Sequence, residues 1–283
     1  MKPAPFSYAA PSTIEEAVSL LAEYGDDAKV IAGGQSLMPM MNMRLATPRL
    51  LVDINRIPGQ DGILTNGGIH IGALVRQSAA ERSRDLLTAA PIFGPALRHI
   101  AHAGIRSRGT ICGSLAHADP AAELPAVMLA LGATVEATGR DGVRTIPVEE
   151  FFVGFLSTTL EDDELITGVK IPLPAAGTRF AFLEVARRHG DFALVGVAAL
   201  LEVEDGTVRR ARIALSGVAD RPVLATEAAQ VLIGSDPTDP SVCEEAGHAA
   251  ASVLRPPSDV HGSGDYRAQV ASVLIRRAVA STN

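Results

Sequence analysis

Two glycine-containing segments hold the residue types in this chain that are best suited to binding chemistry. The first, residues 30–37, is a short apolar run followed by two glycines, an amide and a hydroxyl. Because glycine adopts positive φ angles and has no Cβ, successive backbone N–H groups in such a segment can converge on one point. That concavity suits an anion, most often the phosphate of a ligand. The alternative is an ordinary turn between a strand and a loop, which a Gly-Gly pair also signals.

The second segment, residues 108–120, carries Gly109 and Gly113 among threonine and serine hydroxyls and leads into Glu123 and Pro125. Two such loops could hold the two phosphates of a dinucleotide from both sides. A Walker-type phosphate loop is excluded because no Gly-Lys-Ser/Thr follows either segment, and the chain has no Gly-x-Gly-x-x-Gly fingerprint.

The order of residues in both segments resembles one family. Ala-Gly-Gly-Gln-Ser-Leu begins at Ala32 and is followed by Pro39 and Arg44, and Thr-x-x-Gly-Ser-x-Ala-x-Ala-Asp-Pro-x-x-Glu-x-Pro begins at Thr110. Together they resemble the FAD-binding (medium) subunits of molybdenum hydroxylases, which include xanthine dehydrogenase and, most similar here, aerobic carbon monoxide dehydrogenase. The resemblance runs from the N-terminus through both segments to the end of the chain.

The resemblance implies an α+β fold in two domains. A two-lobed FAD-binding domain of the p-cresol-methylhydroxylase type would span residues 1–175, with lobes at about 1–56 and 57–175. A smaller C-terminal α+β domain, an antiparallel sheet plus helices, would span residues 176–283. The Pro-Ala-Ala-Gly stretch at 174–177 is the clearest linker between them.

Hydrophobic periodicity and turn signals place the elements within this frame. Ser12 and Glu15 are spaced as a helix capping box. The pattern predicts strands at residues 29–32, 50–54, 68–72, 134–138, 143–146, 165–171, 180–186, 194–203 and 208–216. It predicts helices at residues 77–87, 96–102, 120–131, 223–232, 240–254 and 266–280.

The family motifs imply which residues bind FAD. The first segment would contribute Ala32, Gly33, Gly34, Gln35, Ser36 and Leu37, and the second Thr110, Gly113, Ser114, Ala118 and Asp119. The Asp119 carboxylate would accept hydrogen bonds from sugar hydroxyls, although a helix N-cap is an alternative and compatible role.

Three further features are secondary. A strand at 166–172 matches a family strand that passes the flavin, which makes Ile166 and Lys170 candidates, although Lys170 also reads as an ordinary solvated lysine. Residues 187–193 match another family motif, which faces either the flavin ring or a partner subunit, or is a charged strand end with Asp191 as counter-ion. Cys112 stands where the family commonly has glycine, and its Cβ should disfavour a positive φ there.

The family resemblance implies a function in electron transfer. FAD in this chain would take electrons from [2Fe–2S] clusters in a small partner subunit and pass them to an external acceptor. Substrate would be oxidised at a molybdopterin cofactor in a large partner subunit, and the three subunits would assemble as a dimer of heterotrimers. No catalytic residue is expected in this chain. The alternatives are a stand-alone flavin oxidase or dehydrogenase that acts on a small substrate, and a non-enzymatic nucleotide-binding or assembly protein.

Composition argues against several classes of partner and site. The 283 residues carry 25 Lys and Arg against 32 Asp and Glu, a net charge of −7 that argues against a nucleic-acid partner. The N-terminus has no signal-peptide pattern and no run of about 18 apolar residues occurs, so we expect a cytoplasmic protein without a membrane span. Cys112 and Cys243 cannot supply the ligands of an iron–sulfur cluster, and His99 with His102 is too small a set to predict a metal site.

Overall fold

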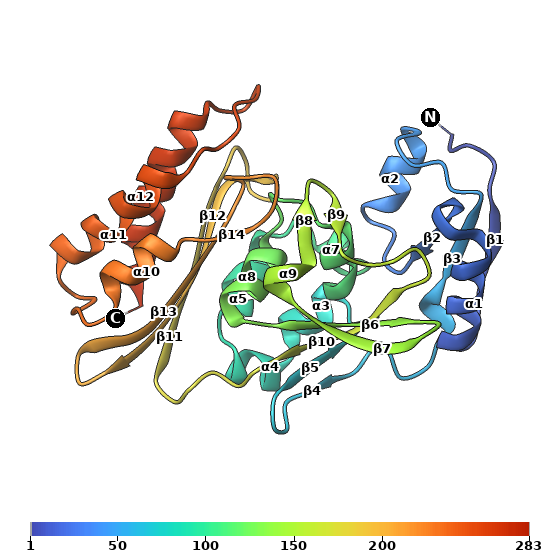
Figure 1. Ribbon diagram of the computed structural model, residues 1–283, viewed down its shortest axis with the longest axis horizontal. Helices are drawn as coiled ribbons and strands as arrows, with labels where there is room; N and C mark the ends of the chain where they lie inside the picture. The colour runs from blue at the N-terminus through green and yellow to red at the C-terminus, as the bar shows by residue number, and fades with distance from the viewer. Residues whose placement is uncertain (1, 283) are drawn as a thin grey trace.

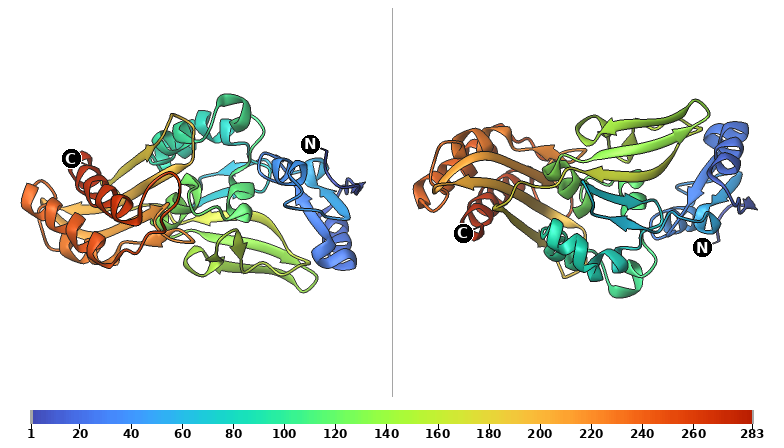
Figure 2. Two further views of the ribbon diagram at one scale, coloured as in Figure 1. Left: turned by 90° about the horizontal axis from the view of Figure 1, so that it is seen from above. Right: turned by 90° about the horizontal axis from the view of Figure 1, so that it is seen from below.

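A computed structural model describes residues 2–282 of the chain. Three layers of sheet and helix follow one another along the long axis of the molecule, with the N-terminal lobe at one end and the C-terminal helices at the other (Figure 1). Both further views keep these two parts at opposite ends (Figure 2). The α+β fold class expected from the sequence is confirmed.

The first lobe is a small parallel sheet. Its strands lie in the order β1-β3-β2, with β1 at Ser7–Ala9, β2 at Ala28–Ile31 and β3 at Leu50–Asp53. Helix α1 (Ile14–Tyr24) covers the sheet, and helix α2 (Leu37–Asn42) follows the first glycine segment.

Helix α1 begins one residue later than the predicted capping box. Thr13 is its N-cap and accepts a hydrogen bond from the Glu16 N–H at 3.2 Å. The Glu16 carboxylate in turn accepts from the Ser12 N–H at 2.8 Å. The reciprocal capping expected from the sequence is present, but Glu16 and not Glu15 completes it.

The second lobe is an antiparallel sheet with helices packed against one face. The strands run in the order β4-β5-β10-β6-β7, with bounds Ile63–Leu64, Ile69–Gly72, Leu165–Ile171, Thr134–Gly139 and Gly142–Pro147. The helices are α3 (Gln77–Arg82), α4 (Arg84–Ala89), α5 (Phe93–His99), α6 (Ala103–Arg106), α7 (Ile111–His117), α8 (Glu123–Leu131) and α9 (Val148–Phe151). A short hairpin of β8 (Phe152–Gly154) and β9 (Ser157–Thr158) completes the lobe.

The third layer is an antiparallel sheet covered on both faces. Its strands lie in the order β11-β12-β13-β14, at Thr178–Ala186, Ala193–Glu204, Thr207–Ser216 and Val223–Leu224. Helices α10 (Thr226–Leu232), α11 (Pro240–Val253) and α12 (Gly264–Ser281) cover one face, and α5 and α8 of the second lobe pack on the other (Figure 1). Burial on both faces explains why β12 reads as a continuous apolar run.

Several predicted elements differ from the structure. The helix expected at 223–232 begins only at Thr226, because Val223–Leu224 form strand β14, which pairs with β13. The helix expected at 77–87 is two helices divided at Ser83, whose hydroxyl accepts from the Leu86 N–H and so starts α4. The helix expected at 96–102 begins at Phe93 and ends at His99, and the one expected from 120 begins at Glu123. Most of the second glycine segment, expected as a loop, is helix α7.

Candidate functional site

The first glycine segment is a tight turn between β2 and α2. Gly34 has a φ of 71°, a conformation that suits glycine, and its carbonyl accepts from the Met38 N–H at 3.1 Å. The Gln35 side-chain amide folds back and donates to the Gly33 carbonyl at 3.1 Å. The N–H groups of residues 33–36 meet no hydrogen-bond acceptor within residues 2–282. The turn therefore presents successive unengaged backbone donors, as an anion-binding turn requires.

The two glycine segments touch each other. A Cβ built on Gly33 would run into the Arg108 carbonyl oxygen and would lie 2.8 Å from the Gly109 Cα. Gly33 itself is buried. The first segment thus lies directly against the start of the second, and glycine is required at position 33 because backbone meets backbone there.

The second segment is held by backbone bonds and then becomes a helix. The Gln77 N–H donates to the Gly109 carbonyl at 2.8 Å, and the Ile111 N–H donates to the Val75 carbonyl at 3.1 Å. Thr110 is the N-cap of α7, and its hydroxyl accepts from the Gly113 N–H at 2.9 Å. A Cβ on Gly113 would lie 2.5 Å from that hydroxyl, so this glycine makes room for the cap and not for a positive φ.

Cys112 lies inside helix α7, where its backbone does not need the positive φ that a Cβ disfavours. Cys112 does not have a positive φ, so replacing the family glycine with cysteine causes no backbone strain at this position. The side chain is buried, with Sγ 3.7 Å from the Gly72 carbonyl oxygen. Burial raises the pKa of the Cys112 thiol to about 12, which makes it an unreactive core group.

A chain of polar side chains joins the two lobes beside Gly33. Asn55 donates to the Ala32 carbonyl at 2.8 Å and accepts from the Arg76 guanidinium at 2.5 Å. Arg76 also donates to the Arg108 carbonyl at 2.5 Å, the same carbonyl that faces Gly33. Asp53 anchors Asn55 by accepting from its backbone N–H at 2.9 Å. These residues carry no local motif, and the sequence analysis missed them.

Asp53 and Arg76 both stay charged at neutral pH, although their surroundings favour the charged form only for Asp53. Burial opposes the ionisation of Asp53, but hydrogen bonds from Tyr8 and Asn55 hold the pKa of its carboxyl below the ordinary value. Burial and the neighbouring charge of Arg108 lower the pKa of the Arg76 guanidinium. A guanidinium nevertheless keeps its proton at neutral pH.

Asp119 lies in a turn between α7 and α8. Ala118 ends α7 in the left-handed conformation with a φ of 53°, which turns the chain toward α8. The Asp119 carboxylate accepts from the Ala121 N–H at 2.8 Å, which caps this turn; the N-cap of α8 is Ala122. The next carbonyl, that of Pro120, accepts from the Gly217 N–H at 2.8 Å and ties the turn to the C-terminal sheet.

Ile166 and Lys170 face opposite sides of β10, which is the central strand of the second-lobe sheet. Ile166 is 6% exposed and belongs to the core on the helix side, as do Val169 and Ile171. Lys170 lies between the last two and therefore points to the other face, where Nζ is 2.7 Å from a Glu136 carboxylate oxygen. The structure does not bring Ile166 and Lys170 together.

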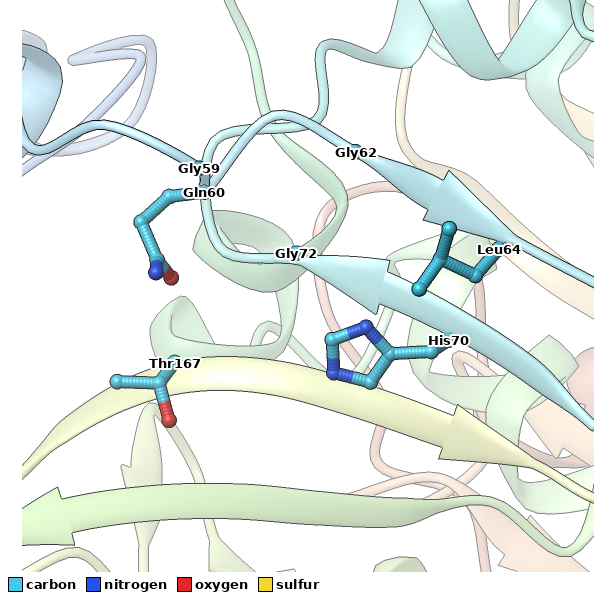
Figure 3. A pocket seen from close by; sticks show the side chains of 7 residues that line it. All are labelled: Gly59, Gln60, Gly62, Leu64, His70, Gly72 and Thr167. Carbon is cyan, nitrogen blue, oxygen red and sulfur yellow. The ribbon is translucent and has the colours of Figure 1, made fainter.

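The face that carries Lys170 also has a small cavity of about 220 Å³. His70 borders it, and the Nε2 atom of that imidazole lies 2.8 Å from Glu136. Figure 3 shows the Gln60, His70 and Thr167 side chains around this cavity. The remaining lining residues are Gly59, Gly62, Leu64 and Gly72. None of the residues predicted to bind FAD lines this cavity.

The remaining predicted features are the charged strand end at residues 187–193 and the histidine pair. The Arg188 Nε is 3.5 Å from the Asp191 carboxylate, so the counter-ion expected for this strand end is present. His99 ends α5 while His102 precedes α6, so the two do not share one helix face. Within residues 2–282, no three His, Cys, Asp or Glu side chains converge as metal ligands would. None of the helices described has both the length and the hydropathy needed to cross a bilayer.

Two known family models match the chain, one over each of its two parts. Residues 4–174 match the family described as the FAD binding domain in molybdopterin dehydrogenase, and residues 180–282 match the CO dehydrogenase flavoprotein C-terminal domain. The chain belongs to the family of FAD-binding subunits of molybdenum hydroxylases. The predicted family, its FAD cofactor and its oxidoreductase class are thereby confirmed.

Similar proteins match this flavoprotein subunit over nearly its whole length. The 6-hydroxypseudooxynicotine dehydrogenase complex subunit alpha of Paenarthrobacter nicotinovorans is 45% identical, over 99% of this chain and 95% of the relative. Caffeine dehydrogenase subunit beta of Pseudomonas sp. strain CBB1 is 38% identical, over 99% of this chain and 95% of the relative. A solved carbon monoxide dehydrogenase from Hydrogenophaga pseudoflava superposes with a TM-score of 0.96 at 37% identity, covering 100% of this chain and 98% of that one.

Proposed function

We propose that the FAD diphosphate binds where the two glycine segments meet. The observation that carries this proposal is the contact of Gly33 with Arg108 and Gly109, beside four successive N–H groups with no acceptor in residues 2–282. The Ser36 and Ser114 hydroxyls also form no hydrogen bond in the described chain and are available to the same ligand. These donors fit a diphosphate, which offers only acceptors.

The other predicted residues take supporting roles in this proposal. Ala32 and Leu37 flank the turn, and Thr110 and Gly113 form the cap that fixes the start of α7. Ala118 sets the turn that presents the Asp119 carboxylate to sugar hydroxyls. Ile166 would line the apolar part of the site, whereas the position of Lys170 favours its alternative role as a surface lysine paired with Glu136.

We propose that the FAD-binding unit spans residues 1–175 and the C-terminal unit residues 176–283. The family matches at 4–174 and 180–282 and the separate C-terminal sheet support this boundary. Hydrogen bonds such as that from Gly217 to Pro120 then join the two units next to Asp119.

The function that follows is electron transfer within a complex. Bound FAD supplies the change between one-electron and two-electron chemistry. This chain binds and orients it, while a small [2Fe–2S] subunit and a large molybdopterin subunit complete a cytoplasmic dimer of heterotrimers. The names of the relatives support this proposal, because they are subunits of dehydrogenase complexes.

Absorbance spectra of the purified complex, before and after dithionite, test the proposal. We expect flavin bands and a broad iron–sulfur shoulder that both bleach, and we expect the separated chain to carry only the flavin bands. A chain that never takes up FAD would contradict the binding site. Direct bleaching of the isolated flavoprotein by a small substrate would instead support the stand-alone oxidase alternative.

A further inference from the structure

A row of polar groups is buried where the C-terminal sheet meets the second lobe. Glu184 on β11 pairs in register with Gly196 on β12, which pairs with Ser216 on β13. Phe182 and Ala198, two positions along these strands, belong to the core that includes α5 and α8. Side chains two apart on a strand share a face, so the row points toward those helices.

The row lacks the partners that buried polar groups normally have. The Glu184 side chain is 1% exposed, and its Oε2 has no hydrogen-bond partner in residues 2–282. The Ser216 hydroxyl is fully buried and is likewise unpartnered within that range. Gly196 leaves room for this hydroxyl, because a Cβ there would lie 2.5 Å from it. A buried carboxylate without a partner is costly, and protonation of the group removes this cost because it removes the charge.

The helices that face the row bring no cation to Glu184. The Gly217 N–H donates to the Pro120 carbonyl at 2.8 Å, which holds the start of α8 next to Ser216. Glu123, the first residue of α8, is 7% exposed and adds a second acid at this junction. His99 at the end of α5 has its Nδ1 3.8 Å from Glu184, beyond hydrogen-bond reach, and its ring stacks with that of His189 at 6.4 Å. Burial, followed by the charges of His189 and the neighbouring Arg98, lowers the pKa of His99, so this imidazole is neutral at neutral pH.

We propose that Glu184 and Glu123 form a buried proton-binding site that joins the C-terminal sheet to α8, and that loss of its proton loosens this junction. A protonated carboxyl is neutral and can donate as well as accept, so it suits this burial where a pair of carboxylates does not. The proton is taken from water and returned to it, with no other bond made or broken. The proposal concerns the junction itself and does not depend on bound FAD.

The direction of the pH dependence follows from the burial of both acids. Burial, with a contribution from the charge of Glu123, raises the pKa of Glu184 from 4.5 to about 8. Burial raises the pKa of Glu123 to about 7, with Asp119 adding to the effect and the Glu123 backbone N–H opposing it. Because the folded protein holds these protons more tightly than the unfolded chain, their stabilisation is complete below pH 4.5 and is lost as pH rises through 7 and 8.

Urea unfolding of the full chain between about pH 6 and about pH 9 tests the proposal, with Glu184→Gln as the variant. We expect the unfolding equilibrium constant of the wild type to rise about tenfold or more over this range and that of Glu184→Gln to rise much less. Glu164→Gln is the matched control, because Glu164 is 8% exposed but accepts from Arg144 at 2.6 Å and 2.8 Å. Its profile should keep the wild-type slope. Equal slopes for the wild type and Glu184→Gln would overturn the proposal.

Infrared spectra of the wild type give a second readout that needs no variant. A protonated carboxyl absorbs as a C=O stretch that a carboxylate lacks, and we expect such a band to persist at neutral pH and to vanish as pH rises through about 7 to 8. No such band at neutral pH would overturn the proposal even if Glu184→Gln failed to fold. Both measurements are made on FAD-free protein and repeated with FAD, so that failure to bind FAD is recorded separately from failure of the proton site.

Discussion

The two glycine segments look alike in sequence but use their glycines for different reasons. In the first, Gly33 allows two backbones to touch and Gly34 provides a positive φ. In the second, Gly113 lies in a helix and makes room for the Thr110 cap, and Cys112 takes the place of another glycine without strain. Tolerance to substitution should therefore be low in the first segment and moderate in the second, even though both are proposed to hold one ligand.

The largest effect is expected for Gly33→Ala. The added methyl meets the backbone of Arg108 and Gly109, which cannot rotate away, so we expect a loss of about 3 kcal/mol in unfolding free energy and of most bound FAD. Urea unfolding and the flavin content of the purified protein measure the two effects. Gly104→Ala is the control, because nothing lies within 4 Å of a Cβ there. Wild-type flavin content in Gly33→Ala would show that the segments do not need this contact.

A smaller loss is expected for Gly34→Val. A β-branched residue strains a φ of 71°, and its Cβ would lie 3.3 Å from side-chain carbons of both Ile31 and Met38. We expect about 2 kcal/mol of destabilisation and weaker FAD binding, measured by unfolding and by flavin titration. Gly34→Asn should recover much of both, because asparagine tolerates this conformation. If Asn and Val were equally damaging, steric crowding rather than backbone strain would be the cause.

Cys112→Gly, which restores the usual family residue, should destabilise the protein. Glycine within a helix costs about 1 kcal/mol, and the buried thiol is lost as well. We expect FAD affinity to stay unchanged, since Sγ points to the Gly72 carbonyl and not to the first segment. Tighter FAD binding by Cys112→Gly would mean that the cysteine restricts the site after all.

The smallest effect is expected for Thr110→Ala. Removal of the cap frees the Gly113 N–H and should cost about 1 kcal/mol, measured by thermal unfolding. Thr110→Ser keeps the acceptor and should lose less. If Thr110→Ala lowered the unfolding free energy by clearly more than this amount and Thr110→Ser did not restore it, the threonine methyl group would have a direct role in packing.

The sequence predicts strands better than it predicts the segments around the site. Strand β10 has the predicted bounds, and the strands predicted at 194–203 and 208–216 pair as a hairpin that turns at Asp205 and Gly206. Alternation and turn residues are local features, which is why the sequence predicts them. Helix α7 is missed because its glycines read as loop residues, whereas the Thr110 cap and apolar burial decide its conformation. Tertiary contacts override local propensity there.

The candidate site likewise contains residues that the local sequence predicts and residues that only tertiary contacts reveal. Its glycines and hydroxyls are recognisable because they form contiguous motifs. Arg76 and Asn55 are not, because their role depends on contacts between lobes that are distant in sequence, with the carbonyls of Ala32 and Arg108. Ile166 and Lys170 are separated onto opposite faces by the irregular register of β10 after Ile166, which no local pattern marks.

The Arg76 guanidinium has a consequence for the order in which the molecule opens. It links Asn55 of the first lobe to Arg108 of the second, and it stays charged across the physiological pH range. The junction at Glu184 has no such permanent charge. In alkaline solution we therefore expect amide hydrogens of β11 to exchange before those of β2. Local unfolding would then begin in the C-terminal sheet while the turn at Gly33 keeps its folded conformation.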